Sequence, residues 1–383
     1  MEFCIDSKDF LASSLIFLAL FLALSCVISI TGCSEQDKKF VETLRPVQTN
    51  TSTSTSTVDL KFNYKELESI VDDIESYKIP ADGEEYNTEK TVNDELEQSS
   101  LIDKDGNILV SVVTNTKYDP VRNYTDADIV LSAGAISIDL GNVYTRGNDT
   151  YCSREYLLNS IALSGLMVDT KDAGILAIID DTKARVNKVL DGKKYVKIDN
   201  NKTLSDDIVS NYMLSTRKEK QIDDFLTIFK DFNSLSVNET ENGATFELDS
   251  DSYSAFFTRA CEYLRARKDS YKQLFGIETS DYDQSDALFD GIIATVNNHS
   301  FNNFMETAGL KFTVSDTVGK VDDTHYTDNI QGVFGKNGAE PIGTLTAKTE
   351  YTLTDNVTFE NIDEFVDYID VIVAMGTFEI EAE

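Results

Sequence analysis

The chain has 383 residues, enough for about one to three domains and a sizeable hydrophobic core. It carries 67 acidic against 34 basic residues, a net charge of −33, and 41% of its residues are hydrophobic. Such an acidic surface repels phosphate backbones, which excludes nucleic acid as a partner, and the hydrophobic content indicates a globular rather than a disordered protein.

An uncharged apolar run covers residues 10–30 and leads into Ile30-Thr31-Gly32-Cys33. Its length suits the core of an export signal or a membrane span. The small residues Thr31 and Gly32, followed at once by Cys33, resemble the lipobox of bacterial lipoproteins. The resemblance implies that Ile30, Thr31 and Gly32 are recognised by the signal peptidase and that residues 1–32 are removed as a signal peptide. It also implies that Cys33 is lipidated, with diacylglycerol and palmitate, and becomes the new N-terminus.

The segment before this run departs from the usual pattern of export signals. It carries Glu2, Asp6 and Asp9 against Lys8, whereas export signals usually begin with basic residues. An uncleaved transmembrane anchor and a soluble secreted product therefore stay open as alternatives. The lipobox itself implies a protein that is lipid-anchored to the bacterial cell membrane, on its extracytoplasmic face.

A polar stretch follows the lipobox and ends in alternating Thr and Ser up to Thr57. Because it has no apolar periodicity, residues 33–57 are predicted to form the lipidated cysteine and a flexible tether. Residues 58–383 then form an extracytoplasmic domain, with a division into two sub-parts left open. This domain contains Cys152 and Cys261, which form one disulfide or stay as two separate buried thiols.

Apolar residues spaced by three and four predict helices in the domain, and Ser252 is expected to cap the most regular of them. The predicted helices are residues 67–74, 153–166, 205–215, 219–232, 252–275, 286–296 and 362–373. Apolar alternation predicts strands at residues 108–113, 127–131, 135–143, 185–190, 194–198, 237–248 (a hairpin), 310–314, 325–334, 344–353 and 357–359. Residues 174–179 are apolar without a pattern that decides their state. Hairpins at both ends with helices between them predict an α+β fold, an antiparallel sheet with helices packed on one face.

A search for catalytic or metal-binding patterns nominates no residue. His299 and His325 each lack a second ligand at i+3 or i+4, which does not favour zinc, and adjacent carboxylates arise by chance among 67 acids. The basic residues of the helix at 252–275 are expected to pair with neighbouring carboxylates; they include Arg259, Arg265 and Arg267. We therefore expect a protein that is not an enzyme and has no cofactor or bound metal.

The strands Asn148-Asp149-Thr150-Tyr151 and Lys193 to Ile198, each followed by helices, and the long strands at 343–353 and 357–359 resemble the LolA- and LppX-like half-barrel lipoproteins. The resemblance spans residues 101–359. It implies a sheet curved as a half-barrel, with helices enclosing an apolar cavity for lipid. The expected function is that of a lipid-anchored, non-enzymatic carrier or binding module for a hydrophobic ligand or lipid. The alternative is a structural or interaction lipoprotein whose acidic face binds an envelope protein partner or calcium.

Overall fold

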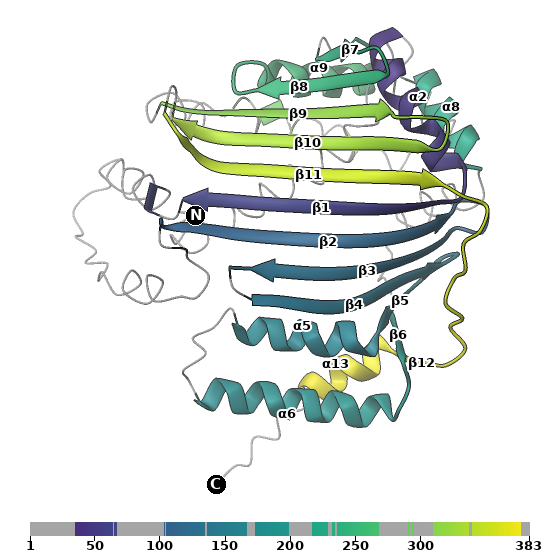
Figure 1. Ribbon diagram of the computed structural model, residues 1–383, viewed down its shortest axis with the longest axis vertical. Coiled ribbons are helices and arrows are strands. Elements are labelled where there is room, and N and C mark those ends of the chain that lie inside the picture. Colours follow the sequence, from purple (N-terminus) through teal and green to yellow (C-terminus); the bar gives the residue numbers. More distant parts are fainter. Residues whose placement is uncertain are drawn as a thin grey trace.

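The computed structural model describes residues 35–63, 65–66, 103, 105–134, 136–166, 173–198, 217–228, 232–233, 236–267, 290, 293–294, 297, 309–336 and 339–376. In this part of the chain, a sheet of twelve strands is accompanied by six helices (Figure 1). The sheet is open and mostly antiparallel, which confirms the α+β class.

The strands follow the order β12-β6-β5-β4-β3-β2-β1-β11-β10-β9-β8-β7 across the sheet, and β12 with β6 is its parallel pair. The strands are β1 (Ser52–Asn63), β2 (Asn107–Asp119), β3 (Tyr124–Ala133), β4 (Ile136–Arg146), β5 (Asp149–Ser153), β6 (Tyr195–Ile198), β7 (Val237–Glu239), β8 (Gly243–Asp249), β9 (Leu310–Lys320), β10 (His325–Lys336), β11 (Pro341–Leu353) and β12 (Phe365–Asp367). The helices are α2 (Glu35–Thr49), α5 (Arg154–Leu166), α6 (Ala173–Leu190), α8 (Lys218–Ile228), α9 (Tyr253–Ala266) and α13 (Tyr368–Gly376).

Several predictions fall outside the described residues. They are the signal peptide at 1–32 with Ile30, Thr31 and Gly32, the lipidated Cys33, the helices at 67–74 and 205–215, most of the helix at 286–296, the end of the helix at 252–275, and His299. None of the described helices is long and apolar enough to cross a membrane.

The prediction of a flexible tether up to Thr57 is wrong, because these residues form α2 and much of β1. β1 lies in the interior of the sheet and pairs antiparallel with β2 on one side and β11 on the other. Alternating Ser and Thr supply little apolar surface, but β-branched Thr favours extended backbone. Two neighbouring strands then satisfy the backbone groups that water would satisfy in a tether.

α2 explains why the folded part begins well before Val58. Phe40, Leu44 and Val47 stand at i, i+4 and i+7 and are only 3%, 5% and 5% exposed. These three apolar residues form a narrow stripe in an otherwise polar helix, and the stripe is buried against β8 and β9. The described part of the fold therefore includes α2, which begins at Glu35, two residues after Cys33 in sequence.

Residues 185–190 form the last turns of α6 instead of the predicted strand of a hairpin. Val186 and Leu190, one helical turn apart, are fully buried. Asp191 and Gly192 adopt φ angles of 42° and 79°, and the Lys193 N–H donates to the Leu190 carbonyl at 2.7 Å. An Asp-Gly pair suits a helix end as well as a hairpin, so the local sequence did not distinguish them. The undecided segment at 174–179 belongs to the same helix.

The C-terminal predictions need two further corrections. Residues 357–359 are not a strand, because the whole segment 354–364 has no regular structure. The expected helix at 362–373 begins later: β12 occupies Phe365–Asp367, and α13 follows from Tyr368.

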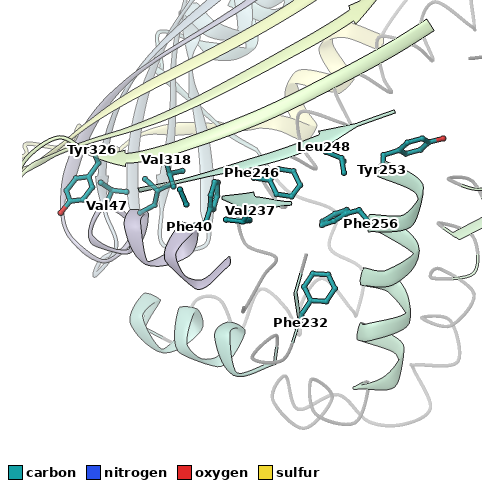
Figure 2. Close-up of a cluster of buried hydrophobic side chains, with 12 residues drawn as sticks. Phe40, Val47, Phe232, Val237, Phe246, Leu248, Tyr253, Phe256, Val318 and Tyr326 are labelled. Atoms are coloured by element: carbon teal, nitrogen blue, oxygen red, sulfur yellow. The ribbon is translucent and has the colours of Figure 1, made fainter. Parts of the chain in front are cut away.

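Two buried clusters lie toward opposite ends of the sheet (Figure 1). The aromatic cluster joins α2 and α9 to β7–β10; its members are Phe40, Leu44, Val47, Phe232, Val237, Ala244, Phe246, Leu248, Tyr253, Phe256, Val318 and Tyr326 (Figure 2). The β5–β6 cluster joins α5, α6 and α13 to the other end; its members are Cys152, Leu157, Val186, Leu190, Val196 and Val371.

Candidate functional site

The two faces of the sheet differ in chemistry, as the alternation of β1 shows. Side chains of a strand alternate between faces, and residues directly opposite each other on neighbouring strands share a face. Val58, Leu60 and Phe62 of β1 therefore lie on one face, which we call the apolar face, while Asp59 and Lys61 lie on the other, the polar face.

The apolar face continues across the middle of the sheet. Leu60 lies opposite Leu345 on β11 and Val110 on β2, and Val58 lies opposite Ala347 and Val112 in the same way. The row through Val112 extends to Leu131 on β3 and Ile138 on β4. Toward β9, Val314, Ile330 and Leu345 are buried, but from β1 to β4 these apolar side chains remain partly exposed. Exposed apolar surface of this kind marks a candidate binding face.

Hydroxyl groups occupy the neighbouring cross-strand row on the same face. Thr349 of β11, Ser56 of β1 and Thr114 of β2 stand directly opposite one another. The Thr349 hydroxyl donates a hydrogen bond to Ser56 Oγ at 3.0 Å. The apolar face thus changes from aliphatic to hydroxyl-bearing along the direction of its strands.

Asp328 on β10 continues this hydroxyl row, and Asp316 on β9 lies in the next row on the same face. Asp328 stands opposite Val318 and Thr349, while Asp316 stands opposite Ile330, so both carboxyls point to the apolar face. Asp316 is 2% exposed, and the Oδ1 atoms of both aspartates are buried without a hydrogen-bond partner among the described groups. We call these residues the Asp316–Asp328 pair.

Burial and mutual repulsion keep the Asp316–Asp328 pair partly protonated. Burial, with the nearby charge of Asp328, raises the pKa of Asp316 to about 9. Burial also raises the pKa of Asp328, although a hydrogen bond from Asp316 opposes that shift. The pKa of each carboxyl therefore lies above the usual value for aspartate, and Asp316 is the one held protonated at neutral pH.

Sequence reasoning missed this pair because the two residues are twelve positions apart and come together only through strand pairing. The sequence nevertheless contains a sign of a buried carboxyl. Asp316 stands at the inward position of a strand, between the inward residues Val314 and Val318. Adjacent acidic residues such as Asp322 and Asp323 are visible in the sequence, but both are exposed.

The polar face carries a groove of about 380 Å³ over the centre of the sheet. Its lining includes Thr53, Thr55, Asn115, Lys117, Asp126 and Asp128. The segment 354–364 is fixed beside these strands, where the Glu360 N–H donates to Asp126 Oδ2 at 2.8 Å and Lys117 Nζ donates to the Thr358 carbonyl at 3.2 Å.

The other residues predicted as site residues belong neither to the Asp316–Asp328 pair nor to the groove of the polar face. Cys152 on β5 and Cys261 on α9 are two separate, buried, free thiols, which is the second of the two alternatives considered. His325 is exposed, with Nδ1 2.8 Å from Asp322 Oδ2. Of the basic residues on α9, Arg265 pairs with Asp290, as expected. Within the described residues, no group of three metal-ligating side chains occurs.

Comparison with known proteins returned no match, whether the chain was compared with protein-family models, with curated proteins or with solved structures.

Proposed function

We propose that the protein is a lipid-anchored lipoprotein of the extracytoplasmic membrane face that binds a hydrophobic ligand on the apolar face of its sheet. The proposal has two parts: an anchor at Cys33 and a binding face between two groups of helices. We propose a binding role without catalysis for the protein, in which aliphatic and hydroxyl side chains around the carboxyl pair form the recognition surface.

The observation that carries the proposal is one cross-strand row that connects the two buried clusters. The row starts at Tyr326 in the aromatic cluster and ends at Cys152 and Val196 in the β5–β6 cluster. Its members in strand order are Tyr326, Tyr351, Ser54, Thr116, Ala127, Val143, Cys152 and Val196. Because a row shares one face, this row supports the part of the proposal in which the helices at both ends of the sheet pack on the apolar face.

Between the two groups of described helices, the described part of the chain leaves the middle of that face uncovered. α2 packs mainly on β7–β9 and α5 on β4, whereas the aliphatic side chains of β1–β3 stay partly exposed. An acyl chain placed there would remove this surface from water, at roughly 25 cal/mol per Å². We also propose that the sheet curves so that the middle of its apolar face is concave, as in the half-barrel lipoproteins.

The start of α2 at Glu35 bears on how the domain sits at the membrane. With Cys33 acylated, one residue would separate the anchor from the helix that packs in the aromatic cluster. We therefore propose that the binding face lies close to the bilayer instead of at the end of a long tether, which suits uptake of a membrane lipid.

Native mass spectrometry of the full chain in detergent tests the binding function. We expect a co-purifying lipid, or uptake of an added dioleoyl lipid, as a defined mass increment. Val112→Asn, on the apolar face of β2, should lower lipid retention by roughly tenfold because it places an amide against the acyl chain. The matched control is Ser111→Asn, on the polar face of the same strand, which should retain lipid as the wild type does. A bare protein mass under all these conditions contradicts the proposal.

A second candidate function, an interaction lipoprotein, is favoured by the exposed apolar side chains of α13. Ile369 and Val373 are 58% and 57% exposed. Exposed apolar residues on one short helix are typical of a partner contact. Loss of a co-purifying envelope protein in Ile369→Ser/Val373→Ser, together with the absence of any bound lipid, would favour this function over the carrier.

A further inference from the structure

The charges of the sheet are distributed unequally between its two faces. On the polar face, the described strands carry basic residues in their central rows, among them Lys61, Lys117 and Lys348. On the apolar face, the basic residues of the described strands are Lys320 and Lys336, each at the end of its strand. Lys320 is moreover paired with Asp323 at 2.7 Å. Among the described strands, the centre of the apolar face therefore carries no basic side chain.

The Asp316–Asp328 pair instead places hydrogen-bond acceptors at this position. Asp316 is 2% exposed, and the Oδ1 atoms of Asp316 and Asp328 are buried without a partner among the described groups. Asp328 is partly exposed as a residue, and Thr349, which donates to Ser56, stands opposite it on β11. A carboxylate and a line of hydroxyls thus border the aliphatic part of the face.

We propose that this row, from Asp328 through Thr349 and Ser56, selects the polar group of the bound lipid: it accepts a hydrogen-bond donor without negative charge and rejects phosphate and carboxylate groups. A hydroxyl or an ammonium group supplies such a donor. This inference rests on the proposed lipid-binding function and adds to it the chemical class of the ligand.

The physical reason is the balance between desolvation and pairing. A polar group that leaves water to enter this row must recover its hydrogen bonds from the row itself. A hydroxyl or ammonium group can donate to the Asp328 carboxylate, and such charge-assisted bonds are the stronger ones. A phosphate or carboxylate would instead face the carboxyl pair. The central rows of the described strands place no basic side chain on this face, so they do not offset the cost of removing the anion from water.

Three lipids with the same acyl chains test the selection: dioleoylglycerol, a dioleoyl lipid with a dimethylammonium head, and dioleoyl phosphatidic acid. Each is added to the full chain in detergent, and the lipid-bound fraction is measured by native mass spectrometry. We expect the hydroxyl or the ammonium lipid, or both, to be retained about tenfold more than phosphatidic acid. Retention of one of the two identifies which donor the row accepts.

The variant that tests the row is Asp328→Asn, which keeps the shape of the side chain and removes its charge. It should bring the retention of the three lipids to within about threefold of one another. Asp59→Asn, on the polar face of β1, removes one charge elsewhere and should keep the wild-type preference. Far-UV circular dichroism and a melting curve check that both variants are folded.

The outcomes separate the inference from the function on which it rests. Equal retention of all three lipids by the wild type, a preference for phosphatidic acid, or an unchanged preference in Asp328→Asn would overturn the selection while leaving lipid binding intact. Absence of any bound lipid in the wild type would overturn both.

Discussion

Arg146 on β4 and Asp126 on β3 form an ion pair, with Arg146 Nη2 2.5 Å from Asp126 Oδ1. Both side chains are nearly buried, 12% and 9% exposed. The same two residues hold the C-terminal segment: Arg146 donates to the Glu360 carbonyl at 2.7 Å, and Asp126 accepts from the Glu360 N–H at 2.8 Å. This pair thus joins the centre of the sheet to the segment that leads from β11 to β12.

Replacing Arg146 with Met should lower the free energy of unfolding by about 3–5 kcal/mol, because it leaves the Asp126 carboxylate buried without its cation. Urea unfolding measures the loss, and limited proteolysis should show faster cleavage in residues 354–364. Asp181→Asn is the control, since Asp181 pairs with Arg185 one helical turn away and its side chain is 65% exposed. A change below about 1 kcal/mol is expected there. Equal effects of the two variants would contradict this account.

Asp316→Asn should stabilise the protein at pH 8 and lose that advantage near pH 4. In the folded protein the pKa of Asp316 is about 9, above the ordinary aspartate value of 3.8, so between these values the unfolded chain releases a proton that the folded chain retains. The free energy of unfolding of the wild type therefore falls as pH rises through this window, and below about pH 4 the carboxyl is neutral in both states. Asparagine has no proton to lose, so it removes the loss of stability that the buried Asp316 carboxyl causes as pH rises. We expect this gain to be about 1–4 kcal/mol.

Urea unfolding of wild type and Asp316→Asn at several pH values between 4 and 9 measures this difference. Asp181→Asn again serves as the control for the loss of one negative charge. A stability difference that does not change with pH, or an Asp316→Asn variant less stable than the wild type at pH 8, would show that the carboxyl is ionised in the folded protein.

Two leucines of α6 should differ in their contribution to stability. Leu190 is fully buried in the β5–β6 cluster, whereas Leu176 is 42% exposed near the start of the same helix. Leu190→Ala should lower the free energy of unfolding by about 2–5 kcal/mol, and Leu176→Ala by no more than about 0.5 kcal/mol. Similar losses would mean that residues 185–190 are not in the helix as described, for instance in the hairpin that the sequence suggested.

The sequence predicted the α+β class and most of the strands, because inward apolar residues at every second position are visible without knowing the partners. It did not predict β1, whose strand character comes from two neighbouring backbones rather than from its Ser and Thr side chains. It also missed the Asp316–Asp328 pair, since the proximity of the two carboxyls exists only in the register of β9 and β10. Local patterns report propensity, whereas register is set by the whole sheet.

The thiols of Cys152 and Cys261 should be unreactive in the folded protein. Both are buried and free, and burial raises the pKa of Cys152 to about 11 and that of Cys261 above its usual value. A buried thiol with a raised pKa provides little thiolate for alkylation. Iodoacetamide labelling followed by peptide mass mapping should modify both residues in 6 M urea and neither in native buffer. A peptide pair linked through Cys152 and Cys261 under non-reducing conditions would show that a disulfide forms instead.

The N-terminal boundary of the folded part is tested by comparing two shortened chains with the full chain. A chain that begins at Val58 lacks α2 and the first half of β1, so it exposes apolar side chains of the aromatic cluster and leaves parts of β2 and β11 as open edges. We expect it to aggregate or to unfold without cooperativity, whereas a chain that begins at Ser34 keeps both elements and should melt as a single cooperative transition. Far-UV circular dichroism and size-exclusion chromatography report the outcome. A monomeric, cooperatively folded chain from Val58 would contradict this account. It would show that the fold does not need residues 34–57 and that the second half of β1 is enough to join β2 to β11.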